Sequence, residues 1–353
     1  MKEHYDIIIL GAGPAGSNFA RRVDGGKYDV LLVSGTGQRG EKPCGGLISP
    51  DAQKLLAEYD INLPKDVLAN PQLFSVKTID LETEQVKYYG RNYINVDRAK
   101  FDQFFVDMVP EYVDKLDAIG TKVEKCEEGY RVFLNTGSEN RILSCDYIVG
   151  ADGANSIVRK CLFSDYKVHR YVAIQQWFEA GEENPYYSCI FDEETSPSCS
   201  WIFFKDGNMI LGGAFDSKNC RKSFERQKEK LVEKGFVTQG TFDFPIKTEA
   251  CQVIRPHWNY GICQGEEHAF LIGEAAGFIS ASSLEGISFA MASGEALANA
   301  FSDGNDILKK YKSGTQKLRL KTWLKCVKRP FMYQPLLRNL VMKSGITAIK
   351  VKV

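Results

Sequence analysis

The sequence predicts an α/β protein in which a Rossmann-like dinucleotide-binding domain is interrupted by an antiparallel β-sheet domain and followed by a helical C-terminal segment. Three observations lead to this fold class. The chain opens with an apolar strand, a glycine-rich turn and a helix. Short aromatic strands dominate residues 171–254, and a second apolar strand with a glycine-rich turn follows them. A chain of 353 residues is long enough for two domains.

The first turn has the pattern of a dinucleotide-binding site. Residues 5–10 form a predicted buried strand, and Gly11-Ala12-Gly13-Pro14-Ala15-Gly16 leads from it into a predicted helix. In such a G-x-G-x-x-G turn the glycines permit a tight bend, close approach of a pyrophosphate and helix–strand packing. Proline suits the first helical position because no amide hydrogen is needed there. The sequence therefore predicts a pyrophosphate at the N-terminus of this helix.

The end of the second predicted strand lacks the usual acidic residue. Asp or Glu there binds the ribose hydroxyls of a dinucleotide, whereas residues 29–33 lead into Ser34. A serine hydroxyl binds a ribose more weakly than a carboxylate does. We therefore expect Ser34, Arg39 or the backbone to hold the adenosine end. The glycine-rich segment 35–49 follows, and a long loop beside such a turn is typical of a functional segment.

Composition indicates the compartment. The ten cysteines are scattered without a C-x-x-C pair, and no apolar run is long enough to cross a membrane. The first strand begins within five residues of the N-terminus, which leaves no room for a targeting segment. We therefore expect a cytoplasmic protein with reduced thiols. The four histidines lack paired spacing, so we expect no metal.

The C-terminal segment is strongly basic. Residues 309–353 contain thirteen Lys or Arg and no acidic residue, so the 45 basic and 45 acidic residues of the whole chain leave 32 and 45 for residues 1–308. Apolar residues lie between the charges, and Pro330 and Pro335 are expected to break the segment into helices. Two interpretations stay open, which are docking on the inner face of an anionic membrane and packing on the acidic remainder of the chain. Nucleic acid is not expected, because no recognised fold supports it.

Three glycine-containing segments, 11–16, 150–153 and 273–277, each follow a predicted apolar strand. Open α/β sheets bind ligands at the carboxyl ends of their strands. Together these segments resemble the FAD-dependent class that includes aromatic hydroxylases, squalene epoxidase and geranylgeranyl reductases. The resemblance implies FAD, with its pyrophosphate on the first turn and near Asp152-Gly153. It implies further contacts to the cofactor from Arg98, Gly273, Glu274, Gly277, Gly286 and Ile287, with Glu274 standing where the class has Asp.

Within that class, residues 1–305 are most similar to the geranylgeranyl reductase family. Lys42-Pro43-Cys44-Gly45-Gly46 matches the family's loop beside the flavin, which implies that Cys44, Gly45 and Gly46 contact the cofactor. The Cys44 thiol would tune the flavin or give a proton to the substrate, and the alternative is a packed thiol. Residues 42–47, 171–177 and 273–287 look like bacterial members of this family associated with colicin M resistance.

A second stretch of the same resemblance concerns the substrate. Trp201, Phe203 and Gly212 match the family motif that shapes an isoprenoid pocket, although Cys199 and Phe204 replace the family's Tyr and Pro. Alternation along a strand lets only Trp201 and Phe203 of the three aromatic residues at 201–204 share one face. The expected pocket residues are Gln176, Trp177, Trp201, Phe203 and Gly212, and the alternative is that they form sheet core.

The expected function is that of an FAD-dependent oxidoreductase. The resemblance implies reduction of double bonds in an isoprenoid, polyprenyl or similar apolar substrate by hydride from reduced flavin, with NAD(P)H or another external donor. Two alternatives are a class A monooxygenase and a non-enzymatic, membrane-associated flavoprotein. We expect an FAD-binding domain of residues 1–70, 97–167 and 258–308, a substrate domain of residues 71–96 and 168–257, and the basic segment 309–353.

Overall fold

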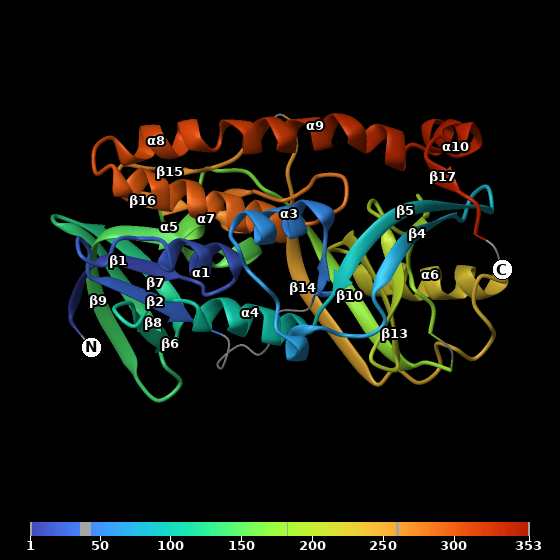
Figure 1. The fold of residues 1–353 in the computed structure, drawn as a ribbon, viewed down its shortest axis with the longest axis horizontal. Coiled ribbons are helices and arrows are strands. Elements are labelled where there is room, and N and C mark those ends of the chain that lie inside the picture. Colours follow the sequence, from blue (N-terminus) through green and yellow to red (C-terminus); the bar gives the residue numbers. More distant parts are fainter. Residues whose placement is uncertain (1, 36–43, 182, 259–260, 352–353) are drawn as a thin grey trace. The chain divides into compact units, whose positions relative to one another are not determined.

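The computed structural model describes residues 2–35, 44–181, 183–258 and 261–351 (Figure 1). The chain forms two compact units. Unit 1 comprises the described residues of Met1–Lys42, Ala99–His169 and Ile254–Leu324, and unit 2 those of Pro43–Arg98, Arg170–Val253 and Lys325–Val353.

Unit 1 is built on a sheet whose central strands are parallel, as the sequence predicts. Strand β1 (His4–Leu10) lies between β2 (Val30–Ser34) and β9 (Asn140–Gly150), parallel to both. Residues 7–10 are at most 2% exposed, because both faces of the strand are covered. The other strands that the structure describes in this sheet are β6 (Asp114–Asp117), β7 (Ile119–Cys126), β8 (Gly129–Asn135), β15 (Gly265–Glu266) and β16 (Ala269–Leu271).

Two helices of unit 1 pack closely against each other. Helix α1 (Pro14–Ala20) lies against α7 (Ile287–Ser302), where Asn18 Nδ2 donates a 2.6 Å hydrogen bond to the carbonyl oxygen of Met291. The remaining described helices that lie in or begin near this unit are α4 (Arg98–Asp107), α5 (Ile157–Leu162), α8 (Ile307–Gly314) and α9 (Gln316–Tyr333), with 3-10 turns at Gly153–Asn155 and Gly273–Ala276. The contact of α1 with α7 joins the first glycine turn to the last part of unit 1.

Unit 2 contains a mostly antiparallel sheet of β3 to β5, β10 to β14 and β17. The sequence predicts antiparallel strands here, and the one difference among the described pairings is that β11 and β4 run parallel. The strands are β3 (Leu47–Ile48), β4 (Leu73–Asp80), β5 (Gln85–Asn95), β10 (His169–Glu179), β11 (Tyr186–Phe191), β12 (Ser200–Lys205), β13 (Asn208–Asp216), β14 (Lys247–Arg255) and β17 (Ala348–Ile349).

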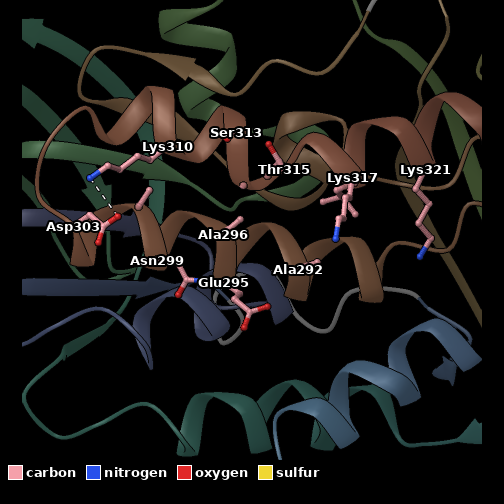
Figure 2. A pocket seen from close by; sticks show the side chains of 13 residues that line it. Ala292, Glu295, Ala296, Asn299, Asp303, Lys310, Ser313, Thr315, Lys317 and Lys321 are labelled. Carbon is pink, nitrogen blue, oxygen red and sulfur yellow. Dashed lines mark ion pairs between the residues drawn. The ribbon is translucent and has the colours of Figure 1, made fainter.

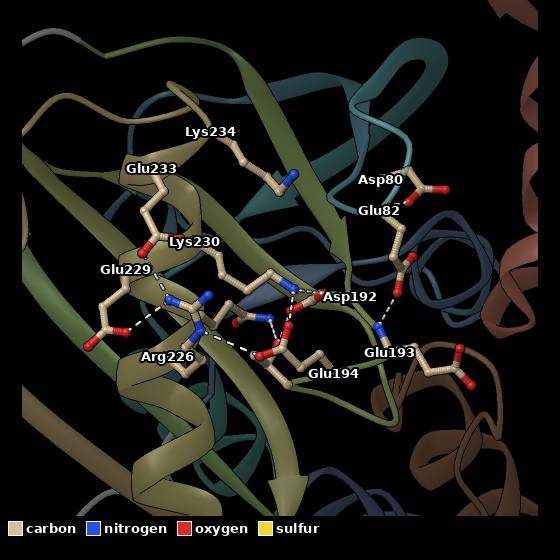
Figure 3. Close-up of polar contacts among 12 residues, drawn as sticks. Asp80, Glu82, Asp192, Glu193, Glu194, Arg226, Glu229, Lys230, Glu233 and Lys234 are labelled. Atoms are coloured by element: carbon tan, nitrogen blue, oxygen red, sulfur yellow. Dashed lines mark hydrogen bonds and ion pairs between the residues drawn. The ribbon is translucent and has the colours of Figure 1, made fainter.

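The helices of unit 2 are α3 (Pro50–Glu58), α6 (Cys220–Glu233) and α10 (Pro335–Ser344), with a 3-10 turn at Lys65–Val67, within the described residues. Helix α6 is held to the sheet by a buried ion pair, seen in Figure 3: Lys230 Nζ lies 2.5 Å from Asp192 and 2.8 Å from Glu194. Because Asp192 is buried, loss of Lys230 would leave an uncompensated charge.

The boundaries of the two units differ from the predicted domains. Residues 44–70 belong to unit 2, because β3 pairs with β5 and Val96 N donates to Gly46 O. The basic segment is divided between the units: Tyr311 of α8 donates a 2.8 Å hydrogen bond to Leu271 O in unit 1, and Arg338 of α10 forms an ion pair with Asp80 in unit 2.

The prediction that Pro330 ends a helix is wrong. Pro330 lies inside α9, which continues to Tyr333, and the chain turns only before Pro335 at the start of α10. A proline in the last turn removes one hydrogen bond but leaves few residues beyond it to be displaced. None of the helices in the described part of the chain has the length and hydropathy that crossing a bilayer requires.

Candidate functional site

The first glycine turn is in direct contact with the second glycine segment. Gly11 has φ +109°, and a Cβ atom there would lie 2.5 Å from the carbonyl oxygen of Ala151. A Cβ atom on Gly16 would lie 1.9 Å from the carbonyl oxygen of Gly11. Only glycine therefore allows the turn to close against α1 and against the end of β9.

Gly13 has the opposite surroundings. A Cβ atom at this position would have no described atom within 4 Å, so the backbone before α1 borders open space. Pro14 occupies the start of the helix, as the sequence predicts, and Ala15 behind it is buried. This pattern leaves room for a ligand beside Gly13, which is what a pyrophosphate needs.

The carboxyl group of Asp152 is only half satisfied. Its Oδ2 accepts a 2.6 Å hydrogen bond from Ile157 N, while Oδ1 is buried and has no hydrogen-bond partner among the described residues. Burial raises the pKa of this carboxyl above its usual range. Buried acceptors are normally hydrogen-bonded. Asp152 Oδ1 is therefore the acceptor in this segment that a bound cofactor hydroxyl would satisfy, and the residue fits an FAD site.

The third glycine segment packs on α1 as well. Gly273 N donates a 2.8 Å hydrogen bond to Ser293 Oγ of α7, and a Cβ atom on Gly273 would lie 2.9 Å from Ala15 Cβ. Glu274 Oε1 accepts a 2.9 Å hydrogen bond from Ile254 N. Gly277 ends the 3-10 turn that begins at Gly273, and Gly286 and Ile287 stand at the start of α7.

Arg159 joins the second and third segments, and the sequence analysis missed it. The side chain is 2% exposed. Its Nη1 donates a 2.6 Å hydrogen bond to Ala275 O, and its Nη2 donates to Ala154 O. The three segments thus form one connected cradle in unit 1. The sequence carries no sign of this role, because an arginine in a helix is usually exposed.

Three further residues were predicted to contact the cofactor, namely Ser34 and Arg39 at its adenosine end and Arg98 at the start of a helix. Ser34 ends β2 and is half-buried, and its carbonyl oxygen accepts a hydrogen bond from Ala118 N. Arg98 begins α4 and belongs to unit 2. Arg39 lies outside the described residues.

In unit 2 the loop after Cys44 is held by a buried lysine, which the sequence analysis also missed. Lys205 is 5% exposed, and its Nζ donates hydrogen bonds of 2.8 Å to Gly45 O and 2.6 Å to Val96 O. Burial lowers the pKa of its ammonium to about 8, while the nearby Cys44 and Asp97 oppose that shift. A buried lysine between two carbonyl oxygens fixes the backbone of the Cys44 loop.

An aromatic cluster lies on the face of the unit 2 sheet that Lys205 and Phe203 of β12 share. It consists of Leu73, Phe203 and Ile210 at its centre, with Leu47, Tyr93, Trp177, Tyr187 and Trp201 packed around them. A Cβ atom on Gly45 would lie 3.0 Å from Phe203, so the Cys44 loop borders the cluster. Trp201 and Phe203 share this face, as alternation predicts, while Phe204 packs in the core on the opposite face.

The indole of Trp201 is placed by Gly212. A Cβ atom on Gly212 would lie 2.5 Å from the indole ring, so only glycine accepts the ring there. The indole Nε1 is buried and has no partner among the described residues. In contrast, Trp177 Nε1 donates a 2.8 Å hydrogen bond to Glu249 Oε2. The two indoles of the cluster therefore differ, because the donor of Trp177 is satisfied and that of Trp201 is not, among the described residues.

Gln176 does not belong to this cluster, contrary to the expectation. It points to the opposite face of β10, where its Nε2 donates to Thr248 Oγ1 and its Oε1 accepts from Lys228 Nζ of α6, both at 3.1 Å. The reason is the two-residue period of a strand, which puts neighbouring residues on opposite faces. Gln175, on the face of Trp177, donates a 2.7 Å hydrogen bond to Glu249 instead.

Comparison with known proteins agrees with the cofactor that the cradle fits. The family model of an FAD binding domain matches residues 121–246. The fold is similar to that of a geranylgeranyl bacteriochlorophyll reductase-like protein from Thermoplasma acidophilum, with a TM-score of 0.80 and 18% identity over 99% of this chain and 92% of that one. It is also similar to PqsL, a probable FAD-dependent monooxygenase from Pseudomonas aeruginosa, with a TM-score of 0.68 and 15% identity over 97% and 99%.

The fold is that of FAD-binding proteins with a Rossmann-like cofactor domain. Among curated proteins, the chain is 42% identical to Protein CbrA of Escherichia coli strain K12 and to Protein CbrA of Shigella sonnei, in each case over 98% of both chains. The chain belongs to the CbrA family.

Proposed function

We propose that the protein reduces carbon–carbon double bonds of an isoprenoid, polyprenyl or similar apolar substrate, with NAD(P)H or another external compound as the electron donor. The observation that carries this proposal is the aromatic cluster with the Cys44 loop against its centre. Sites for apolar ligands are lined mainly by apolar and aromatic side chains with few polar groups, which is the composition of this cluster. The similar fold of the Thermoplasma protein, which is described as geranylgeranyl bacteriochlorophyll reductase-like, supports a reductase.

The residues of unit 1 would hold the cofactor. The backbone beside Gly13 and the start of α1 would receive the pyrophosphate, and Asp152 Oδ1 would accept a hydrogen bond from a cofactor hydroxyl. Arg159 would keep the second and third segments at the spacing that this requires. When bound and reduced, FAD supplies the hydride, which is the chemistry that the side chains themselves lack.

The residues of unit 2 would position the substrate and supply a proton. Trp177, Trp201 and Phe203 would cover the apolar chain and exclude water. One carbon of the double bond would take the hydride that reduced FAD supplies, and the other carbon would take a proton from the Cys44 thiol or from water. After a transfer from Cys44, the Lys205 ammonium would stabilise the thiolate until solvent returns its proton.

The test is anaerobic turnover of the FAD-loaded protein with geranylgeranyl diphosphate and NADPH or dithionite. We expect a product that has gained two hydrogen atoms, identified by mass spectrometry. Oxygen consumption with a product that has gained one oxygen atom would instead establish the monooxygenase. Retention of the lipid without turnover by any donor would establish the non-enzymatic flavoprotein.

Replacing Cys44 tests the proton source. In Cys44→Ser we expect slower product formation, or a changed flavin spectrum if the thiol tunes the ring, because serine is a weaker acid than cysteine. The matched control is Cys161→Ser, since Cys161 is an exposed free cysteine of unit 1. No change in either readout would remove Cys44 from the reaction.

A further inference from the structure

Helix α9 carries an apolar stripe that faces solvent. The stripe consists of Leu320, Trp323, Leu324, Val327 and Phe331, at positions i, i+3, i+4, i+7 and i+11 of one helix. These side chains are between 37% and 57% exposed. This spacing places them on a single side. In a globular protein such a side is normally turned to the core, so its exposure requires an explanation.

Two lysines at the start of α9 lie beside the stripe, since Lys317 precedes Leu324 by seven residues, which is about two helical turns. Lys317 and Lys321 line a pocket of about 510 Å³ between α7, α8 and the start of α9 in unit 1, together with small residues of α7 such as Ala292 and Ala296. Figure 2 shows both lysines directed from α9 toward α7. Lys321 Nζ lies 4.9 Å from the centre of the Phe289 ring. The side of α9 that packs lies opposite the stripe, where Thr322 is 4% exposed and Leu318 packs against the core of unit 1. The apolar stripe is therefore the side left uncovered.

Helix α10 repeats this arrangement in unit 2. Its inner side is anchored by Arg338, which is 3% exposed, lies 2.9 Å from Asp80 and also pairs with Glu82. Leu336 and Leu340, which are 77% and 65% exposed, lie one turn apart on its outer side. The inner side of α10 therefore packs on the acidic residues Asp80 and Glu82, and the two leucines on its outer side remain in solvent.

We propose that α9 docks on an anionic lipid bilayer with its apolar stripe inserted at the interface. Leucine, phenylalanine and tryptophan on one side of a lysine-rich helix are the features of helices that lie in the membrane plane. Residues 309–353 contain thirteen basic and no acidic residues, which matches a negatively charged surface. The same charge disfavours the corresponding segment of a second copy of this chain as the occupant, because two such segments repel each other. This inference does not rest on the proposed reaction.

The experiment is flotation of the full-length, FAD-loaded protein with vesicles of phosphatidylcholine containing one third phosphatidylglycerol. We expect the protein to float with these vesicles, to float at least about ten-fold less with pure phosphatidylcholine, and to be released by high salt. Trp323→Ser combined with Leu324→Ser should abolish flotation. The control pair Phe244→Ser with Ile246→Ser, which are 87% and 63% exposed elsewhere in the chain, should leave it unchanged.

A second measurement is independent of the serine variants. Trp323 fluorescence should shift to the blue on vesicle addition and be quenched by brominated lipid, and Trp323→Phe should still float but lack that part of the signal. The proposal is overturned if the wild-type protein ignores anionic vesicles, or if the Trp323/Leu324 variant floats as well as wild type. It is also overturned if light scattering shows a dimer that this variant dissociates, because the stripe would then belong to a second copy.

Discussion

Lys205 Nζ donates a 2.8 Å hydrogen bond to the carbonyl oxygen of Gly45, and through this bond a strand residue buried beneath the aromatic cluster determines where the Cys44 loop lies. A second bond, to Val96 O, ties the same ammonium to the end of the β5 region. Gly46 must be glycine beside it, because a Cβ atom there would lie 2.2 Å from Val96 O. The position of Cys44 therefore depends on the Lys205 ammonium, which holds the backbone of the loop.

Lys205 makes stability depend on pH in a defined direction. Its pKa is lowered to about 8, so the folded protein releases this proton near pH 8, whereas an unfolded lysine keeps it to about pH 10.4. Unfolding then takes up a proton between these values, and the free energy of unfolding rises with pH by at most about 1.4 kcal/mol per unit from this group. We expect urea unfolding of the wild type to show this rise.

Lys205→Met should lack that part of the rise and should be less stable, because two buried carbonyl oxygens lose their donor, at about 1–3 kcal/mol each. Lys54→Met is the control, since the Lys54 side chain is 76% exposed. Equal pH slopes for Lys205→Met and wild type would contradict the assignment.

Arg159→Met should weaken cofactor binding. The variant loses the hydrogen bonds that connect Ala154 to Ala275, so the second and third glycine segments are no longer held together. We expect the dissociation constant for FAD, measured by fluorescence titration, to rise about ten-fold, which corresponds to about 1.4 kcal/mol. Arg131→Met changes an exposed arginine of the same unit and should bind FAD normally. Normal FAD binding by Arg159→Met would show that the segments are positioned without it.

Gly212→Ala should damage the substrate site and spare the cofactor. The added methyl would lie 2.5 Å from the Trp201 indole, so the ring must move or the strands must separate. We expect FAD content to be unchanged and the KM for the apolar substrate to rise about ten-fold, since misplacing a positioning group by an ångström is costly. Gly90→Ala, whose methyl would meet its nearest atom at 3.9 Å, should have no effect. If Gly212→Ala instead leaves KM unchanged, Trp201 does not contact substrate.

Asp152→Asn should stabilise the FAD-free protein at neutral pH. Burial raises the pKa of Asp152, so the folded protein holds this proton to higher pH than the unfolded chain does, and stability falls as pH rises through that window. Asparagine removes the charge and keeps an acceptor for Ile157 N. We expect a higher Tm than wild type in differential scanning calorimetry at pH 7. The exposed Asp165→Asn serves as control, and a lower Tm for Asp152→Asn would contradict the argument.

Local patterns predicted much of the cofactor unit. The turn from Gly11 to Gly16 is recognisable from the sequence because each glycine stands where a side chain would not fit or would block a ligand. In the structure, Cβ atoms at Gly11 and Gly16 would overlap neighbouring backbone, and Gly13 borders open space. Strand alternation likewise predicted that Trp201 and Phe203 share a face. The same alternation along β10 places Gln176 and Trp177 on opposite faces of the strand. The two residues could therefore not both belong to one pocket.

The class of fold, the three glycine segments and the charge of the C-terminal segment are predictable from the sequence, because they depend on residue types at short spacing. The folded structure was needed to show that Arg159 joins two of those segments, that Lys205 holds the Cys44 loop, and that α9 turns its apolar side to solvent. These three results depend on which residues of distant segments meet. The burial of a side chain and the identity of its hydrogen-bond partners depend on contacts between segments that are distant in the sequence, so no local pattern predicts them.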